Sequence, residues 1–243
     1  MRTIRSFLDA PLAVGLKITL PEAASNHLLR VLRLDVGDTC DLFNGDGYDY
    51  RARIVGLQKR GAEIEITGCS EVRNESPLRI TLAQGIARGE KMDLILQKAT
   101  ELGVAVVAPV VTERTEVKLD AERSGKKMHH WRGVTVAACE QCGRARLPEI
   151  LEPQTLDRFA AGDRNARRFI LDPLANLTLP DAALLADTLT LAIGPEGGFS
   201  ERDLVILKVA GYEGLKMGPR ILRTETAGMA AIAALNALYG DWR

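Results

Sequence analysis

The chain has 243 residues, of which 46% are hydrophobic and 26% charged, the balance of an ordinary soluble globular protein with one or two domains. Lysine plus arginine equals aspartate plus glutamate, at 32 each, which excludes a general positive field for nucleic acid, so any anionic partner must be met by a local patch. No apolar run approaches the roughly 18 residues of a membrane span, and charged residues interrupt the N-terminal apolar ones, so neither a transmembrane segment nor a secretory signal is predicted. Four cysteines do not indicate a disulfide scaffold in a chain of this length, and a cytoplasmic protein with reduced thiols is expected.

Residues 1–72 have the pattern of a small β-rich domain. Short alternating or apolar segments are separated by turn signals, which is typical of a small barrel; they are residues 18–20, 39–43, 50–55 and 62–67. Residues 25–33 differ, because His27, Arg30 and Arg33 recur at helical spacing opposite an apolar face. These three side chains form either a solvated helix face or a patch that contacts phosphates.

Residues 73–243 have the pattern of an α/β domain. The polar stretch 70–77 ends in a proline and marks the boundary. Beyond it, buried strands alternate with longer helices, which predicts a mostly parallel sheet with helices on both faces. The expected strands are residues 78–83, 104–111, 169–172, 188–193 and 215–217, and the expected helices are residues 91–102, 131–142, 201–208 and 226–239.

Two glycine-containing loops follow strands of this domain. The first glycine loop, residues 194–198, ends the strand 188–193, and the second glycine loop spans residues 215–223. Ligands of open α/β sheets bind beyond the carboxyl ends of strands, and glycine lets the backbone come close to them, so the two loops are expected to form walls of one pocket.

The first glycine loop does not have the residues of a nucleoside-triphosphate site. It lacks the Gly-Lys-Ser/Thr ending that binds phosphates and Mg²⁺, it lacks dinucleotide glycine spacing, and Glu196 would repel polyphosphate. A neutral or cationic ligand, such as adenosine attached to a sulfonium, fits better. A strand-to-helix turn without any ligand is the alternative.

Cys139 and Cys142 form a CxxC pair with His129 and His130 nearby. A zinc site would need four ligands close together, and a redox dithiol would need a thioredoxin-like strand before it. Small residues on a helix face are therefore favoured over both, and no metal is predicted.

The chain resembles the RsmE-type 16S rRNA uridine-N3 methyltransferases of the SPOUT superfamily over essentially its whole length. Two departures are conservative, because Arg88 stands where a lysine is usual and Cys139 and Cys142 occupy small-residue positions. The segments that carry the resemblance are residues 27–33 with Gly37, 44–47, 91–93, 97–104, Glu113–Arg114, Glu140–Gln141 with Gly143–Arg144, 193–199 and 218–227.

The resemblance implies a fold and an activity. It implies a PUA-like RNA-binding β-barrel over residues 1–72 and a SPOUT methyltransferase domain with a trefoil knot over residues 73–243, in a homodimer. The implied reaction is S-adenosylmethionine-dependent methylation of N3 of a uridine in small-subunit ribosomal RNA, with the RNA free, in the small subunit or in a late assembly particle. A methyltransferase acting on another RNA base or on a ribose 2′-hydroxyl, or a non-catalytic RNA-binding protein, are the alternatives.

The resemblance, together with the chemistry of the implied reaction, points to roles for individual residues. Arg223 is the first candidate to stabilise the anionic base, and Glu225 and Glu196 are weaker candidates for the proton acceptor. The alternative interpretation of Arg223 is a structural pairing with Glu225 or Glu140. A side chain at Gly197 is predicted to intrude on the cofactor. The cofactor-binding candidates are Leu171, Ile193, Gly194, Pro195, Glu196, Gly197, Gly198, Leu215, Met217, Gly218, Ile221, Leu222, Arg223 and Thr226. The RNA-binding candidates are Arg2, Arg5, His27, Arg30, Arg33, Arg88, Lys91, Lys98 and Arg144.

Overall fold

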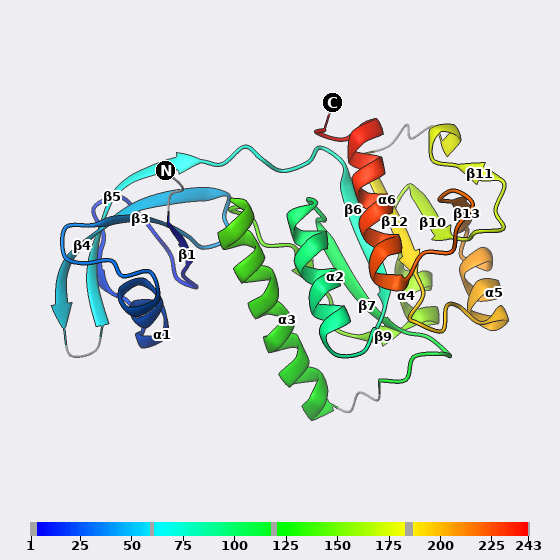
Figure 1. Ribbon diagram of the computed structural model, residues 1–243, viewed down its shortest axis with the longest axis horizontal. Helices are drawn as coiled ribbons and strands as arrows, with labels where there is room; N and C mark the ends of the chain where they lie inside the picture. Colours follow the sequence, from blue (N-terminus) through cyan, green and yellow to red (C-terminus); the bar gives the residue numbers. More distant parts are fainter. Residues whose placement is uncertain (1–3, 59–60, 118–120, 183–186, 243) are drawn as a thin grey trace. The chain divides into compact units, whose positions relative to one another are not determined.

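The computed structural model describes residues 4–58, 61–117, 121–182 and 187–242. Two compact units divide the chain: residues 1–75 with residues 139–147, and residues 76–138 with residues 148–243 (Figure 1). The sequence predicts one division at residue 72 and assigns residues 139–147 to the second domain, whereas the structure groups them with the first unit. The domain limits 1–72 and 73–243 stay a prediction.

The first unit is built on a five-stranded sheet with the strand order β1-β3-β4-β5-β2. β1 runs parallel to β3, and the other neighbours are antiparallel. Ala62, Ile64 and Ile66 of β5 alternate with more exposed residues and pack in the core, which confirms the predicted small β-rich unit. The strands are β1 (Arg5–Phe7), β2 (Lys17–Thr19), β3 (Thr39–Phe43), β4 (Tyr48–Gln58) and β5 (Gly61–Glu71).

The helical segment of this unit differs from the expected regular helix. α1 (Glu22–Asn26) continues into a π-helical turn, η1 (His27–Val31), and Arg33 follows it with a φ of 57°. This left-handed backbone takes Arg33 off the helix, so Arg33 does not share one helix face with His27 and Arg30 as predicted.

The second unit is built on an eight-stranded sheet in which every pairing is parallel. The strand order is β11-β13-β10-β12-β6-β7-β8, and β9 pairs with β7. The strands are β6 (Arg79–Gly85), β7 (Val106–Val111), β8 (Glu149–Ile150), β9 (Gln154–Thr155), β10 (Arg167–Leu171), β11 (Leu177–Thr178), β12 (Thr188–Ile193) and β13 (Glu213–Lys216). The helices are α2 (Glu90–Glu101), α3 (Ala121–Cys142), α4 (Leu156–Gly162), the 3₁₀ turn η2 (Pro180–Ala182), α5 (Glu201–Val209) and α6 (Thr224–Tyr239).

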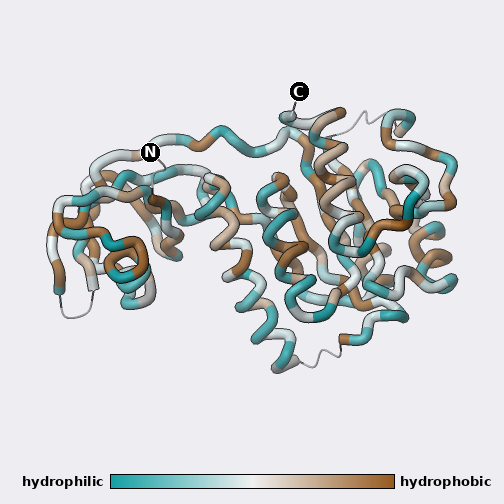
Figure 2. Tube along the Cα trace, viewed as in Figure 1, coloured by the Kyte–Doolittle hydropathy of each residue, from teal (hydrophilic) through white to brown (hydrophobic). Residues whose placement is uncertain are grey.

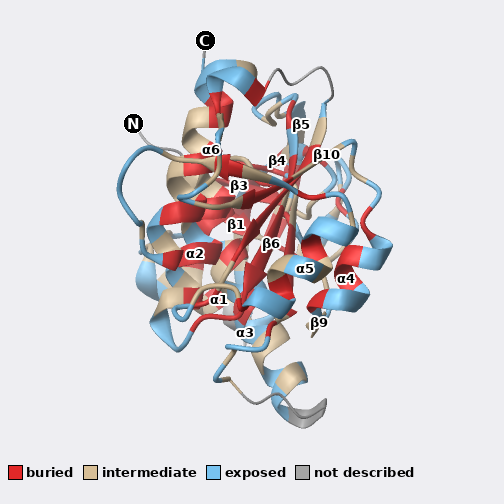
Figure 3. Cartoon of the chain, turned by 90° about the vertical axis from the view of Figure 1, so that its right-hand side faces the viewer, coloured by how far each residue is buried: buried red, intermediate tan, exposed pale blue. Residues whose placement is uncertain are grey.

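Helices cover both faces of this sheet, with α2 and α6 on one side and α4 and α5 on the other (Figure 3). On the first side, Leu96 of α2 and Ile232 of α6 belong to the same core cluster as Leu191 of β12. On the second side, Phe159 of α4 and Leu207 of α5 form a separate cluster. The predicted α/β class with a mostly parallel sheet is confirmed.

Burial on both faces explains why the central strands are almost continuously apolar. Leu191 packs in the first cluster and the next residue, Ala192, in the second, because successive strand residues point to opposite faces. Hydrophobic stretches of this kind are brown in Figure 2 and buried (red) in Figure 3.

The start of α3 could not be predicted from the sequence pattern. α3 begins at Ala121, ten residues before the predicted start at residue 131, because residues 121–130 are polar and show no apolar periodicity. The trefoil knot stays a prediction, since strand order and register do not define how a chain threads through a loop.

Candidate functional site

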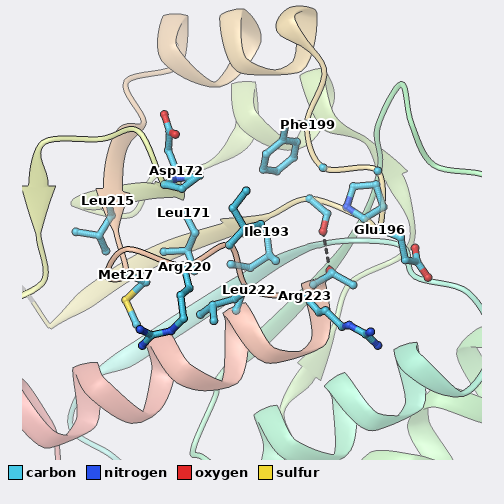
Figure 4. Close-up of a pocket in the computed structure, with 18 of the residues that line it drawn as sticks. Leu171, Asp172, Ile193, Glu196, Phe199, Leu215, Met217, Arg220, Leu222 and Arg223 are labelled. Carbon is cyan, nitrogen blue, oxygen red and sulfur yellow. Dashed lines mark hydrogen bonds between the residues drawn. The ribbon is translucent and has the colours of Figure 1, made fainter.

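A pocket of about 410 Å³ lies beyond the carboxyl ends of β10, β12 and β13 (Figure 4). These strands are parallel neighbours, so the segments that follow them reach the same edge of the sheet. Residues 171–173 start at the last residue of β10, the first glycine loop follows β12, and the second glycine loop starts within β13 and continues beyond it. The structure therefore brings the two loops together around one cavity, as the sequence predicts.

The pocket combines apolar walls with a few charged groups, which is the usual composition of a small-molecule site. Asp172 and Arg220 lie at one side of the view in Figure 4, and Glu196 and Arg223 at the other. The apolar side chains that line the pocket are Leu171, Ile193, Phe199, Leu204, Leu215, Met217, Ile221, Leu222 and Ala227.

All of the predicted cofactor-binding residues line this pocket except Thr226, which is exposed on α6. Their individual roles stay predictions. The lining residues that were not assigned from the sequence are Asp172, Pro173, Phe199, Leu204, Arg220, Thr224 and Ala227. Asp172 is the last residue of the predicted strand 169–172 and Pro173 follows it, and this position at the carboxyl end of a strand is the signal that could have found them.

The first glycine loop is folded tightly on itself and on β6. A Cβ added to Gly194 would lie 2.8 Å from the carbonyl carbon of Gly198, and one added to Gly85 would lie 2.5 Å from the nitrogen of Pro195. Backbone atoms cannot give way at such distances as a flexible side chain can. Gly194 and Gly85 therefore allow a close backbone approach that no other residue permits.

Gly197 lies next to the side chain of Arg114. Its added Cβ would meet the side chain of Arg114 at 3.3 Å, and the Nη1 of Arg114 donates a hydrogen bond of 2.8 Å to the Gly197 carbonyl. The sequence-based expectation that a side chain here would intrude on the cofactor stays a prediction, and Arg114 is the protein side chain that such a residue would meet. Gly198 and Gly218 lie in open space but have φ of 67° and 80°, which favours glycine.

Thr224, the first residue of α6, connects the two glycine loops. Its Oγ1 donates a hydrogen bond of 2.6 Å to the Gly194 carbonyl and accepts one of 2.9 Å from the Nε2 of Gln84. The same Nε2 donates to the Gly85 carbonyl at 2.9 Å. The end of β6, the first glycine loop and the start of α6 are thus held together by side-chain hydrogen bonds.

Glu196 is anchored and is poorly suited to accept a proton. Its Oε1 accepts the N–H of Arg88 at 3.1 Å and lies 3.4 Å from the Nζ of Lys91. Burial alone would raise the pKa of Glu196, but the hydrogen bond from Arg88 and the charge of Lys91 outweigh it, so the pKa is lowered. An ionised carboxylate with a lowered pKa is a weak base, so Glu196 is better described as the anchor of the first glycine loop.

Arg223 lines the pocket, whereas Glu225 does not. Arg223 is exposed, and among the described residues its guanidinium has no hydrogen bond or ion pair. The expected pairing with Glu225 is therefore absent there, and Glu140 accepts the N–H of Phe7 within the first unit. Glu225 does not line the pocket, and its buried Oε2 has no hydrogen-bond partner in the described part of the chain.

Two of the RNA-binding candidates are structural. Arg5 has a side chain only 8% exposed, which pairs with Asp49 at 2.5 Å and donates to the carbonyls of Cys139 and Arg144. Arg144 is buried and pairs with Glu75 at 2.6 Å. Both guanidiniums are committed inside the first unit, which corrects the expectation that they contact RNA.

The other RNA-binding candidates keep surface positions. Arg30 and Arg33 are exposed and His27 is half-buried, while Arg2 lies outside the described residues. The remaining three are engaged in partly exposed ion pairs, which compete only weakly with a phosphate: Arg88 with Glu116, Lys91 with Glu196, and Lys98 with Glu101.

No group of three or more His, Cys, Asp or Glu side chains among the described residues could hold a metal ion, and none of their helices could cross a membrane. The hydrogen bond with Cys142 and burial both raise the pKa of Cys139, which keeps it a thiol and opposes a redox-nucleophile role.

The parallel α/β sheet with a glycine-walled pocket at its carboxyl edge, following a small β unit, has the arrangement that the sequence resemblance implies for an RNA methyltransferase with a PUA domain. Residues 74–236 match the RNA methyltransferase domain family, and residues 20–67 match the RNA methyltransferase PUA domain family. The chain belongs to the ribosomal RNA small subunit methyltransferase E family, which confirms the resemblance found in the sequence.

Relatives of this family match almost the whole chain. The ribosomal RNA small subunit methyltransferase E of Buchnera aphidicola (subspecies Schizaphis graminum) is 33% identical over 99% of this chain and 98% of its own. The Neisseria gonorrhoeae enzyme of the same name, solved bound to S-adenosylmethionine, is 37% identical with a TM-score of 0.94 over 100% of both chains. The Legionella pneumophila protein Lpg2936, solved with the same cofactor, is 41% identical with a TM-score of 0.95 over 99% of this chain and 100% of its own.

Proposed function

We propose that this chain transfers the methyl group of S-adenosylmethionine to N3 of a uridine in 16S ribosomal RNA. The observation that carries the proposal is the single cavity that both glycine loops wall, with apolar side chains between its charged residues. Membership of the family supports the reaction class, and the cofactor bound by the Neisseria and Legionella relatives supports the methyl donor. The choice of uridine N3 rests on the family resemblance.

The residues of the pocket suit the chemical parts of this cofactor. Apolar side chains such as Leu171, Ile193 and Leu222 offer a surface for the adenine ring, and backbone groups of the two glycine loops offer hydrogen bonds. The charged lining residues are the carboxylates of Asp172 and Glu196 and the guanidiniums of Arg220 and Arg223, so the pocket offers partners for both the cationic and the carboxylate groups of this cofactor. When bound, S-adenosylmethionine supplies a methyl group on a positively charged sulfur.

The chain's own task is to hold the two reactants and to stabilise charge. Uridine N3 becomes a good nucleophile only when its proton has gone to solvent or to a base, which leaves negative charge on the ring oxygens. N3 then forms a bond to the methyl carbon as the carbon–sulfur bond breaks. Arg223 has an unpaired guanidinium on the pocket wall, so it is the described residue best placed to stabilise that anion, and the target base must leave its stack to reach it.

Ribosomal RNA is the expected partner, either in the small subunit or in a late assembly particle. Exposed cations outside the pocket, such as Arg30 and Arg33, are the candidates to hold its backbone. We also expect a homodimer, and we expect it to act in the cytoplasm, where ribosomes are assembled.

Calorimetry with S-adenosylmethionine, followed by methylation of 16S ribosomal RNA and of small subunits, tests the proposal. The RNA should come from a strain that lacks this protein, and its nucleosides should be separated by mass spectrometry. The expected product is 3-methyluridine. A methylated 2′-hydroxyl or another methylated base would overturn the assigned target, and the absence of cofactor binding would overturn the activity.

A further inference from the structure

We propose that Gln84 and Thr224 are positioning residues whose directed hydrogen-bond relay locks the two glycine loops into the arrangement that binds the cofactor. The inference rests on the proposed function, because it assigns the relay to the cofactor pocket. Neither residue stood out in the sequence, and Gln84 does not line the cavity. Its effect must therefore act through Thr224 and Gly194.

The direction of the relay is fixed by one carbonyl group. The Gly85 carbonyl oxygen can only accept, so the Gln84 side-chain atom 2.9 Å from it must be the amide NH₂ and not the amide oxygen. The same NH₂ then donates to the Oγ1 of Thr224. The hydroxyl proton of Thr224 is left to donate to the Gly194 carbonyl at 2.6 Å. Every donor in the chain Gln84–Thr224–Gly194 thus points the same way.

Burial makes the relay more than a surface contact. Gln84 is 0% exposed and Thr224 7% exposed, so water does not readily replace a lost bond. The Oε1 of Gln84 has no hydrogen-bond partner within the described residues, which costs folding free energy. β6 lies between β12 and β7, and burying the Gln84 amide in it lowers the stability of the fold. We explain its presence by the two hydrogen bonds that its NH₂ group donates.

The relay joins three segments that are distant in sequence. Gln84 lies near the end of β6, Gly194 begins the first glycine loop, and Thr224 directly follows the second glycine loop. The first loop already rests against β6 through Gly85 and Pro195. Thr224 adds the only hydrogen bond recorded between Gly194 and α6 in the described residues, so its hydroxyl sets the spacing of the two pocket walls.

The test compares two substitutions of Thr224 in the full-length protein. Thr224→Val removes the hydroxyl and keeps the shape, whereas Thr224→Ser keeps the hydroxyl. Thr224→Val should raise the Kd for S-adenosylmethionine by about 10-fold, the loss of roughly one buried hydrogen bond, and Thr224→Ser should stay within about 2-fold of wild type. Calorimetry gives both values.

Thr190 provides the matched control. It is a buried threonine in the middle of β12, and its Oγ1 accepts a hydrogen bond of 2.7 Å from the Nδ2 of Asn165, away from the pocket lining. Thr190→Val should lower thermal stability without changing the cofactor Kd. If Thr190→Val weakened binding as much as Thr224→Val, general loss of stability would explain both, and the relay would be overturned.

Gln84→Met tests the first link of the relay. A relay predicts that the double variant Gln84→Met/Thr224→Val binds no more weakly than the weaker single variant, because either change breaks the same chain. Additive losses, or a Thr224→Val variant that binds like wild type, would overturn the relay and leave the proposed function standing. A wild-type protein that binds no S-adenosylmethionine would overturn the proposed function and this role together.

Discussion

Substitution of Arg223 gives the most direct test of the proposed chemistry. It lines the pocket, and no described acidic side chain pairs with it. We expect Arg223→Ala to lower kcat by about 10²- to 10³-fold, the effect of removing one donor from a developing anion, with a Kd for the cofactor within a few-fold of wild type. Arg223→Lys keeps the charge and should recover part of the rate. Single-turnover methylation and calorimetry measure the two quantities, and a large fall in thermal stability with unchanged kcat would assign Arg223 a structural role.

Glu196 gives a prediction with a defined pH dependence. Its folded pKa is lowered, so its stabilisation is complete above the unfolded value of about 4.3 and disappears as the pH falls through the lower folded pKa. The side chain is 27% exposed, so Glu196→Gln should lower the free energy of unfolding by no more than about 1 kcal/mol near pH 7. Urea unfolding of both proteins between pH 3 and pH 7 measures the difference. A gap that widens in acid would contradict the assigned sign.

At the scale of the element, the first glycine loop depends on its close backbone contacts. Alanine at Gly194 would bring a Cβ within 2.8 Å of the Gly198 carbonyl carbon, so the loop must open. Gly194→Ala should therefore abolish measurable cofactor binding in calorimetry. Gly133→Ala is the control, because Gly133 is exposed in α3 with open space around its Cβ position, and it should leave binding intact while stabilising the helix by about 1 kcal/mol. Equal affinities of the two variants would show that the loop tolerates the side chain.

Elements with a strong internal pattern were predictable from the sequence. The apolar spacing of α2 and the buried run of β12 each identify their element, because burial of a face or of both faces dictates the residue types. The first half of α3 and the short strands β8 and β9 were not predictable. They carry no periodicity of their own, and β8 and β9 are defined only by their pairing with β7.

The outline of the candidate site was predictable and its internal connections were not. Glycines after parallel strands indicated where a pocket would lie, since the strand ends share one edge of the sheet. Pairing of Arg5 with Asp49, and of Arg144 with Glu75, joins residues 44 and 69 positions apart, which a single sequence does not reveal. Gln84 was missed because a lone polar residue in a strand gives no sign of its partners.

At the scale of the whole molecule, we expect a mutation in the first unit to change its stability without changing the cofactor affinity of the second unit. Arg5 holds the first unit through Asp49 and two carbonyl groups, while the pocket lies entirely in the second unit. Arg5→Ala should destabilise the first unit by about 3 kcal/mol, because it leaves a partly buried carboxylate without its partner, and should leave cofactor affinity unchanged. Hydrogen exchange measured separately for each unit gives the change in stability, and calorimetry gives the cofactor affinity.

Lys17→Ala, which removes an exposed pair with Glu65, is the control and should change stability by less than about 1 kcal/mol. Loss of cofactor binding in Arg5→Ala would mean that the units do not respond separately.

Because residues 139–147 belong to the first unit, that unit cannot complete its core early in translation. Phe43 is covered by Cys139 and Ala145, so this part of the core is incomplete until the chain has been translated beyond Leu147. At about 5–20 residues per second, a nascent chain that has finished its fifth strand waits several seconds for that cover. During this interval the ring of Phe43 remains accessible to water and to chaperones. The main core cluster of the first unit uses only residues up to Ile66, so synthesis from the N-terminus favours its early folding, while the Phe43 region is completed only after residues 139–147 have been made.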